Sequence, residues 1–118
     1  MSKKGRVFVV QNQHRLNAAK QQFEPKFDLS PAAEYGELVY LLSPTASPFR
    51  PEPLVAELRE KLRGFDDDDH LLLIGNPVLI GLAVTIASDW NDGSVSLLQW
   101  SGKDGRYLRV AIKDLFTY

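Results

Sequence analysis

The sequence contains no cysteine, which excludes disulfide bonds, thiolate metal sites and a cysteine nucleophile. It also lacks an excess of either charge, because 14 Lys and Arg residues stand against 15 Asp and Glu residues. The net charge of -1 supplies no global positive field for nucleic acid or an anionic membrane, so any such contact has to be local. The lack of cysteine is compatible with a reducing cytoplasm.

Motifs that carry catalysis or bind phosphate are missing as well. Neither GxGxxG nor GxxxxGK[ST] occurs. The two histidines, His14 and His70, do not lie in a recognisable serine or threonine motif, and nothing places the carboxylates Glu34 and Glu37 in a cleft. These absences favour a protein that is not an enzyme, and we expect no cofactor.

Long apolar runs are scarce. The basic residues Lys3, Lys4 and Arg6 precede only the short run Val7–Val10, which is too short for a signal peptide. The uncharged stretch from 71 to 88 is long enough for a membrane-spanning helix, but Pro77 would break a continuous helix at a cost of about 3 kcal/mol. A strand followed by a helix fits this stretch better.

The length and composition are those of one folded unit. With 118 residues, 44% of them hydrophobic and 25% charged, the chain is expected to form a single domain over 1–118. Val7–Val10 and Phe23–Leu29 have strand character and predict an N-terminal hairpin whose turn lies within 17–22. A short turn of helix is expected over Pro31–Tyr35, with Gly36 as its stop.

The rest of the pattern predicts an α/β fold. Leu38–Leu42 and Leu71–Ile74 are unbroken apolar runs, which in strands indicates that both faces are covered. An amphipathic helix is expected over 54–62 and a largely buried helix over Pro77–Trp90, capped by Asn76. Together with the strand from Val95, these elements form two crossover units, so we expect a small sandwich with a parallel β-α-β-α-β core over about 38–100.

A C-terminal antiparallel hairpin completes the predicted fold. Val95–Trp100 and Tyr107–Ile112 flank a short polar segment that contains two glycines. Trp100 and Tyr107 lie nearly opposite each other and are expected to form a cross-strand aromatic pair.

Two loops are candidates for a ligand site. Ligands of parallel α/β sheets usually bind beyond the carboxyl ends of the strands. The loop 43–50 and the corner 75–77 both follow predicted strands there. If those strands are adjacent, the loops supply hydroxyl, guanidinium, amide and backbone N–H groups for a phosphate or nucleotide; the candidate residues are Ser43, Thr45, Ser47, Arg50, Gly75 and Asn76. The other interpretation is structural, since capping alone explains Asn76.

The predicted N-terminal hairpin is a candidate for single-stranded nucleic-acid binding. Aromatic side chains stack on bases, and Lys or Arg side chains contact phosphates. The residues that carry this hypothesis are Arg6, Phe8, Arg15, Lys20, Phe23, Lys26 and Phe27. The alternative is that the aromatic residues belong to the core.

The acidic run Asp66–Asp69, followed by His70, has ligand types that suit a metal ion. Its spacing does not match an EF-hand, because Leu71 and Pro77 stand where Gly and Glu are needed. We therefore expect no metal site and interpret the run as a solvated loop that precedes a buried strand.

Three segments resemble a known group of proteins: Phe27–Glu37, Gly75-Asn76-Pro77 and Leu98-Gln99-Trp100. The chain is similar to short uncharacterised proteins encoded by tailed bacteriophages. The resemblance implies a cytoplasmic protein of an infected bacterium that binds host or viral machinery. It assigns no activity and no functional residue.

Three functions stay open on these observations. The first is a non-enzymatic binding or regulatory protein with a host or phage protein as partner. A variant of this hypothesis is a homo-oligomer that forms through the apolar second helix or an exposed sheet edge. The second is a small-molecule binding protein or enzyme that uses the two loops. The third is a single-stranded nucleic-acid binding protein that uses the hairpin. No membrane partner is expected.

Overall fold

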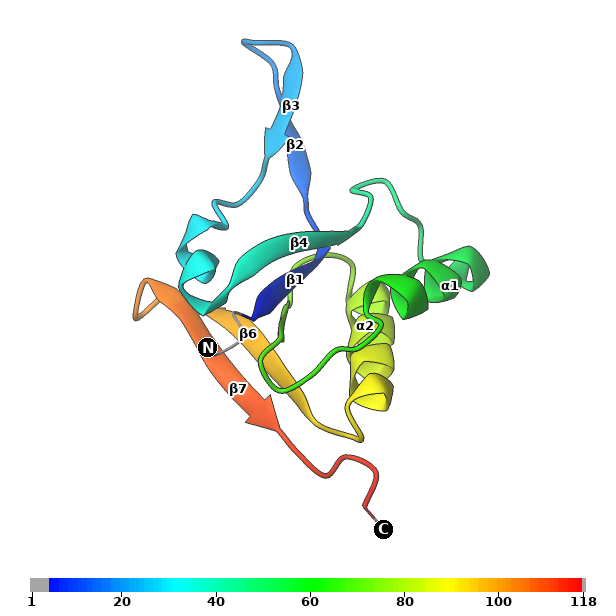
Figure 1. The fold of residues 1–118 in the computed structure, drawn as a ribbon. Helices are drawn as coiled ribbons and strands as arrows, with labels where there is room; N and C mark the ends of the chain where they lie inside the picture. Colours follow the sequence, from blue (N-terminus) through cyan, green and yellow to red (C-terminus); the bar gives the residue numbers. More distant parts are fainter. Residues whose placement is uncertain (1–4, 118) are drawn as a thin grey trace.

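A five-stranded, mostly parallel sheet forms the centre of the computed structural model, which describes residues 5–117 (Figure 1). The elements along the chain are β1 (Arg6–Gln11), β2 (His14–Asn17), β3 (Gln22–Pro25), the 3-10 helix η1 (Ser30–Tyr35), β4 (Glu37–Leu42), α1 (Pro51–Lys61), β5 (His70–Leu72), α2 (Pro77–Trp90), β6 (Val95–Ser101) and β7 (Arg106–Ile112). The strand order in the sheet is β4-β1-β5-β6-β7. Only the β6–β7 pair is antiparallel within this sheet. The predicted α/β class, parallel core and C-terminal hairpin are confirmed.

The position of β1 corrects the sequence prediction. Val7–Val10 does not pair with Phe23–Leu29 but lies between β4 and β5, parallel to both. All four of its residues from Val7 to Val10 are at most 1% exposed. Their unbroken apolar pattern suits a central strand, because side chains on both faces of such a strand are buried.

The edge strand β4 is a second correction. The apolar run Leu38–Leu42 was expected to be covered on both faces, but Tyr40 is 51% exposed. β4 pairs with β1 alone, so its other side has no neighbouring strand within residues 5–117. Both crossovers run as predicted, from β4 through α1 to β5 and from β5 through α2 to β6, with β1 inserted between β4 and β5.

Two hydrophobic clusters lie on the two faces of the sheet. The larger cluster joins Phe8 and Val10 to residues of α1 and α2, and these helices cover one face (Figure 1). The smaller cluster joins Val7 and Val9 to the segment around η1 on the other face. The hydroxyl of Tyr35 in η1 donates to the backbone carbonyl of Tyr107 at 2.8 Å, which fastens this cover to β7.

The corner between β5 and α2 is formed as the sequence predicts. The side chain of Asn76 accepts a hydrogen bond from the backbone N–H of Val78 at 2.9 Å, and Pro77 occupies the first turn of the helix. The stretch considered as a membrane span is therefore a short strand followed by a helix. Within residues 5–117, no helix combines the length and the apolar character needed to cross a membrane.

A separate two-stranded hairpin, β2–β3, projects from the body of the molecule (Figure 1). Its turn lies where the sequence places it, between Asn17 and Gln22. Its strands start only after β1 has ended, so the hairpin is shorter than predicted. Leu16 and Phe23 lie opposite each other in its register, and their side chains are 60% and 73% exposed.

Candidate functional site

The ends of β1 and β5 form a topological switch point. These strands are parallel neighbours, yet the chain leaves β1 toward β4 on one side and leaves β5 toward β6 on the other. Connections that diverge in this way leave a crevice beyond the carboxyl ends of the two strands, where ligands of open α/β sheets usually bind.

A cleft of about 610 Å³ lies at this place. Gln13 follows β1, and the segment Leu73–Gly75 follows β5; both line the cleft. Trp100 and Tyr107 close it from the C-terminal hairpin, while residues 26–28, which follow β3, and Pro31 in η1 also line it. We call this space the switch-point cleft.

Aromatic rings dominate the wall of the switch-point cleft. Trp100 and Tyr107 form the expected cross-strand pair, with an edge-to-face arrangement and ring centroids 5.0 Å apart. Trp100 is 50% exposed and Phe27 is 42% exposed, so both rings keep accessible surface. The ammonium group of Lys26 lies 5.4 Å from the centroid of the Phe27 ring.

Several polar side chains of the cleft have no hydrogen-bond or ion-pair partner among the described residues. The ammonium group of Lys26 has only its contact with the Phe27 ring, and the side chains of Gln13 and Trp100 make no hydrogen bond within residues 5–117. Burial raises the pKa of the Tyr107 hydroxyl, and the carboxylate of Asp28 raises it further. The cleft therefore offers an uncommitted cation and hydrogen-bonding groups beside aromatic faces.

The two loops proposed as a ligand site do not follow adjacent strands, because β1 lies between β4 and β5. The side chain of Gln11 joins them instead. Its Nε2 donates to the backbone carbonyls of Ser43 and Ala46 at 3.1 Å each, and its Oε1 accepts from the backbone N–H of Asn76 at 2.9 Å. Gln11 is 5% exposed, and its side chain lies between the two predicted loops and is bonded to both.

The remaining polar groups of these loops make local contacts. The hydroxyl of Ser43 accepts from the backbone N–H of Thr45, and that of Ser47 accepts from the backbone N–H of Phe49. Arg50 precedes α1 as its N-cap residue and is exposed. Among the predicted loop residues, Gly75 lines the switch-point cleft. Thr45 lines a second hollow of about 440 Å³, which also touches Lys26.

The structure separates the residues predicted to bind nucleic acid. Phe8 is 1% exposed in the core, and Arg6 is bonded to Asp69, so neither belongs to the hairpin surface. Phe23 remains as the exposed aromatic ring of the hairpin strands. Lys20 lies 3.7 Å from the carboxylate of Glu24.

Arg15, Lys26 and Phe27 are the remaining residues predicted to bind nucleic acid. Arg15 lies in β2 and is exposed. Lys26 and Phe27, which follow β3, contribute to the wall of the switch-point cleft. The predicted nucleic-acid residues are thus divided among the core, the hairpin and the cleft.

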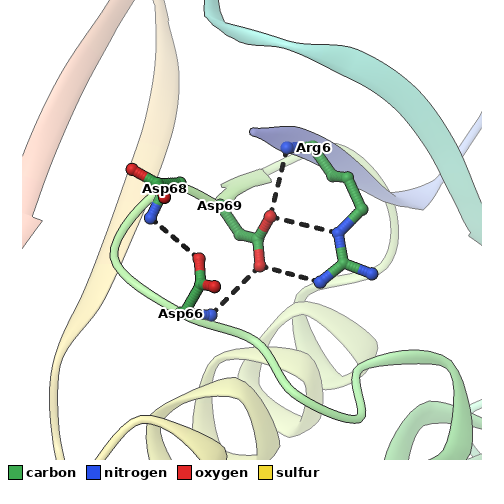
Figure 2. Close-up of polar contacts among 4 residues, drawn as sticks. All are labelled: Arg6, Asp66, Asp68 and Asp69. Carbon is green, nitrogen blue, oxygen red and sulfur yellow. Dashed lines mark hydrogen bonds and ion pairs between the residues drawn. The ribbon is translucent and has the colours of Figure 1, made fainter. Parts of the chain in front are cut away.

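The acidic run holds one structural carboxylate. Asp69 is 0% exposed and accepts four hydrogen bonds: from the backbone N–H and Nε of Arg6, both at 3.1 Å, from Nη2 of Arg6 at 2.9 Å, and from the backbone N–H of Asp66 at 3.0 Å (Figure 2). The interpretation of the whole run as solvated is therefore wrong for Asp69. Its contact also raises the pKa of Arg6, chiefly through the side-chain hydrogen bond.

The histidines are placed far apart. His14 is exposed on the hairpin, whereas His70 is 8% exposed and lies against Tyr35, with ring centroids 5.4 Å apart. Burial lowers the pKa of His70, and the charge of Arg109 lowers it further.

The carboxylate of Glu34 forms an ion pair with Arg106 at 2.9 Å. In the described part of the chain, no three His, Asp or Glu side chains gather as ligands for a metal.

Sequence reasoning missed Gln11, Asp69 and the composition of the cleft. No sequence pattern marked Gln11, because a polar residue at the end of an apolar strand usually reaches solvent; its burial follows from the two loops to which it is bonded. The convergence of Lys26 and Phe27 with Trp100 also had no sequence signal. Lys26 and Phe27 follow β3, whereas Trp100 lies in β6, far away in the sequence.

Comparison with known proteins gives one family. The model of the family described as Phage Pam3 gp32-like protein matches residues 5–114. Neither the curated proteins nor the solved structures compared with the chain contain a match.

Proposed function

The chain belongs to the Phage Pam3 gp32-like protein family, and from this membership we propose that it is a non-enzymatic phage protein that binds a protein of the host or the phage. Hairpin β2–β3 carries the contact. The observation behind this proposal is the exposed cross-strand pair of Leu16 and Phe23 on an element that projects from the body.

Packing within the fold does not explain why the apolar side chains of Leu16 and Phe23 are exposed at these positions. A hairpin of two short strands is marginally stable by itself, and exposed apolar residues in its strands gain little unless something covers them. Burying each side chain against a partner is worth roughly 1.5–3 kcal/mol. An exposed apolar pair of this kind is typical of interaction surfaces, where aromatic residues are enriched.

The charges around the pair indicate the character of the partner. Between His14 and Lys26 the chain has three cations, Arg15, Lys20 and Lys26, and one carboxylate, Glu24. A complementary surface would be an apolar pocket with an acidic rim. A protein partner is favoured over nucleic acid because Phe8 is in the core and Arg6 is bonded to Asp69, which leaves a small basic surface.

The test is affinity capture from infected and uninfected bacteria. The double variant Leu16→Ser/Phe23→Ser removes the apolar pair. The matched control is Phe49→Ser, because Phe49 is 90% exposed and lies in the loop before α1. We expect the wild type and the control to retain one defined protein and the double variant to lose it.

Two results would contradict the proposal. One is retention of the same partner by the double variant. The other is binding to an oligothymidylate strand that requires Leu16 and Phe23 and weakens steeply with salt, because that behaviour belongs to a nucleic-acid surface.

A further inference from the structure

The switch-point cleft combines features that nucleotide sites use, and the hairpin function does not require them. It lies beyond the carboxyl ends of β1 and β5, where the two chain directions diverge. Its volume of about 610 Å³ lies within the range of small-molecule sites. Position and size therefore point to a ligand smaller than a protein.

The aromatic wall selects a planar ring. The side chain of Trp100 is half exposed, with the Tyr107 ring packed against it edge to face, which holds the indole in place without covering all of it. Phe27 adds a second accessible ring in the same cleft. Stacking of a nucleobase on an aromatic side chain contributes about 1–3 kcal/mol per base and tolerates different bases.

The uncommitted polar groups suit the rest of a nucleotide. Lys26 is a cation without an ion-pair partner among the described residues, and an ammonium group is a good partner for phosphate. Gln13 and the indole N–H of Trp100 are available for hydrogen bonds to a base. Asp28 is partly committed, because its Oδ1 accepts a hydrogen bond from the backbone N–H of Ser30 at 3.0 Å, but the carboxylate has room to accept another from an exocyclic amine or a sugar hydroxyl.

We propose that the switch-point cleft binds a nucleoside monophosphate unit, with its base stacked on Trp100 and its phosphate on Lys26. The ligand is either a free nucleotide or one nucleotide of a single strand, since both present the same base and phosphate. Leu16 and Phe23 do not line the cleft, so the two proposals are tested by different variants, although Lys26 lies beside both surfaces and shares the neighbouring hollow with Phe23.

The test is a titration of the full chain with AMP and with UMP, followed by NMR of the tryptophan indole N–H signals. The chain has two tryptophans. The indole of Trp90 donates to the backbone carbonyl of Arg59 at 3.2 Å, on the helical side, and serves as an internal control. We expect the Trp100 signal to shift with saturation and the Trp90 signal to stay in place.

Variants separate the two halves of the ligand. Trp100→Ala should weaken binding roughly fivefold to one hundredfold, which is the range expected for loss of one stacked base. Lys26→Gln should weaken nucleotide binding on the order of fivefold at low salt and leave binding of the unphosphorylated nucleoside unchanged. Lys113→Gln, a charge change at a residue that does not line the cleft, should have no effect.

Four outcomes would overturn the proposal: no shift of Trp100 at millimolar nucleotide, equal binding of inorganic phosphate alone, equal affinity after Trp100→Ala, or a loss of binding only in Lys113→Gln. The indole shift of the wild type decides the case even if Trp100→Ala does not fold. A final arm compares AMP with a short oligoadenylate. Tighter binding of the free nucleotide identifies a small-molecule site, and tighter binding of the strand identifies a strand site; both support the nucleotide chemistry.

Discussion

Replacing the buried carboxylate of Asp69 by an amide tests whether the contact with Arg6 holds β1 to the start of β5. Asp69→Asn preserves the shape of the side chain and leaves one oxygen where there were two. Four donors point at the carboxylate, two at each oxygen (Figure 2). In either orientation of the amide, two of these donors therefore face an N–H₂ group.

The magnitude follows from those two lost bonds. A hydrogen bond to a charged group contributes about 1.5–3 kcal/mol to stability. The side chain of Arg6 is 33% exposed, so part of its loss is recovered through water. The low end of the range therefore applies, and we expect Asp69→Asn to lower the free energy of unfolding by about 3 kcal/mol, in line with the cost of breaking a buried ion pair.

The assay is urea unfolding followed by tryptophan fluorescence, with the midpoint compared at constant m-value. Thermal unfolding should show a fall in Tm of about 12 °C for a chain of this length. Asp68→Asn is the matched control, because Asp68 is exposed and carries the same charge. Its effect should stay within about 0.5 kcal/mol. A loss below about 1 kcal/mol in Asp69→Asn, or equal losses in the two variants, would refute the reasoning.

Three further changes test other contacts. Gly75→Ala should lower the free energy of unfolding by about 2 kcal/mol or more, because Gly75 has φ +128° and an added Cβ would lie 2.6 Å from Cβ of Gln11. The control Gly64→Ala, where φ is +76° and the added Cβ would meet open space, should lower it by only about 1 kcal/mol in the same urea assay. Gln11→Leu should cost about 2–3 kcal/mol, because it leaves buried backbone groups of two loops without partners; an unchanged unfolding midpoint would contradict this. Burial lowers the pKa of His70 because it disfavours the protonated form in the fold, so the free energy of unfolding should fall as the pH drops below the ordinary histidine pKa of about 6.5 and level off below the folded-state pKa. Urea unfolding at several pH values should show a smaller acid loss in His70→Phe, whereas His14→Phe, a change at an exposed residue, should keep the wild-type profile.

The elements predicted correctly are those specified by residues close together in the chain. The cap at Asn76, the proline that follows it and the apolar helix up to Trp90 all act within a few residues, and the structure reproduces them. The C-terminal hairpin is also local. The partner of Val7–Val10 was predicted wrongly because a strand's neighbours are chosen by contacts that are distant in sequence. The unbroken apolar pattern indicated burial on both faces, and a central position follows from that pattern more directly than a hairpin does.

The candidate site was only partly predictable, for the same reason. Gly75 was placed at the carboxyl end of a parallel strand, and it does line the cleft. The general rule for open α/β sheets located the correct edge but not the correct pair of strands. Adjacency of β4 and β5 was assumed, and the insertion of β1 moved the opening to the junction between β1 and β5. The pair of Trp100 and Tyr107 was predicted from the local hairpin, whereas Phe27 comes from a segment distant in the sequence, and only the folded chain brings it to them.

Strand β1 is held by side-chain hydrogen bonds at both of its ends, and these bonds fix the switch point although the neighbouring hairpin projects from the body. At its start, Arg6 is fixed to the buried carboxylate of Asp69, just before β5. At its end, Gln11 is fixed to the loop after β4 and to the corner after β5. The chain becomes exposed three residues later, at His14, where the hairpin begins. Part of the cleft wall, at Gln13 and Leu73–Gly75, thus follows two strands that are bonded to each other through both ends of β1, whereas Leu16 and Phe23 lie on an element with few contacts to the body. The first arrangement favours a ligand that needs fixed geometry, and the second favours a partner that supplies the missing contacts itself.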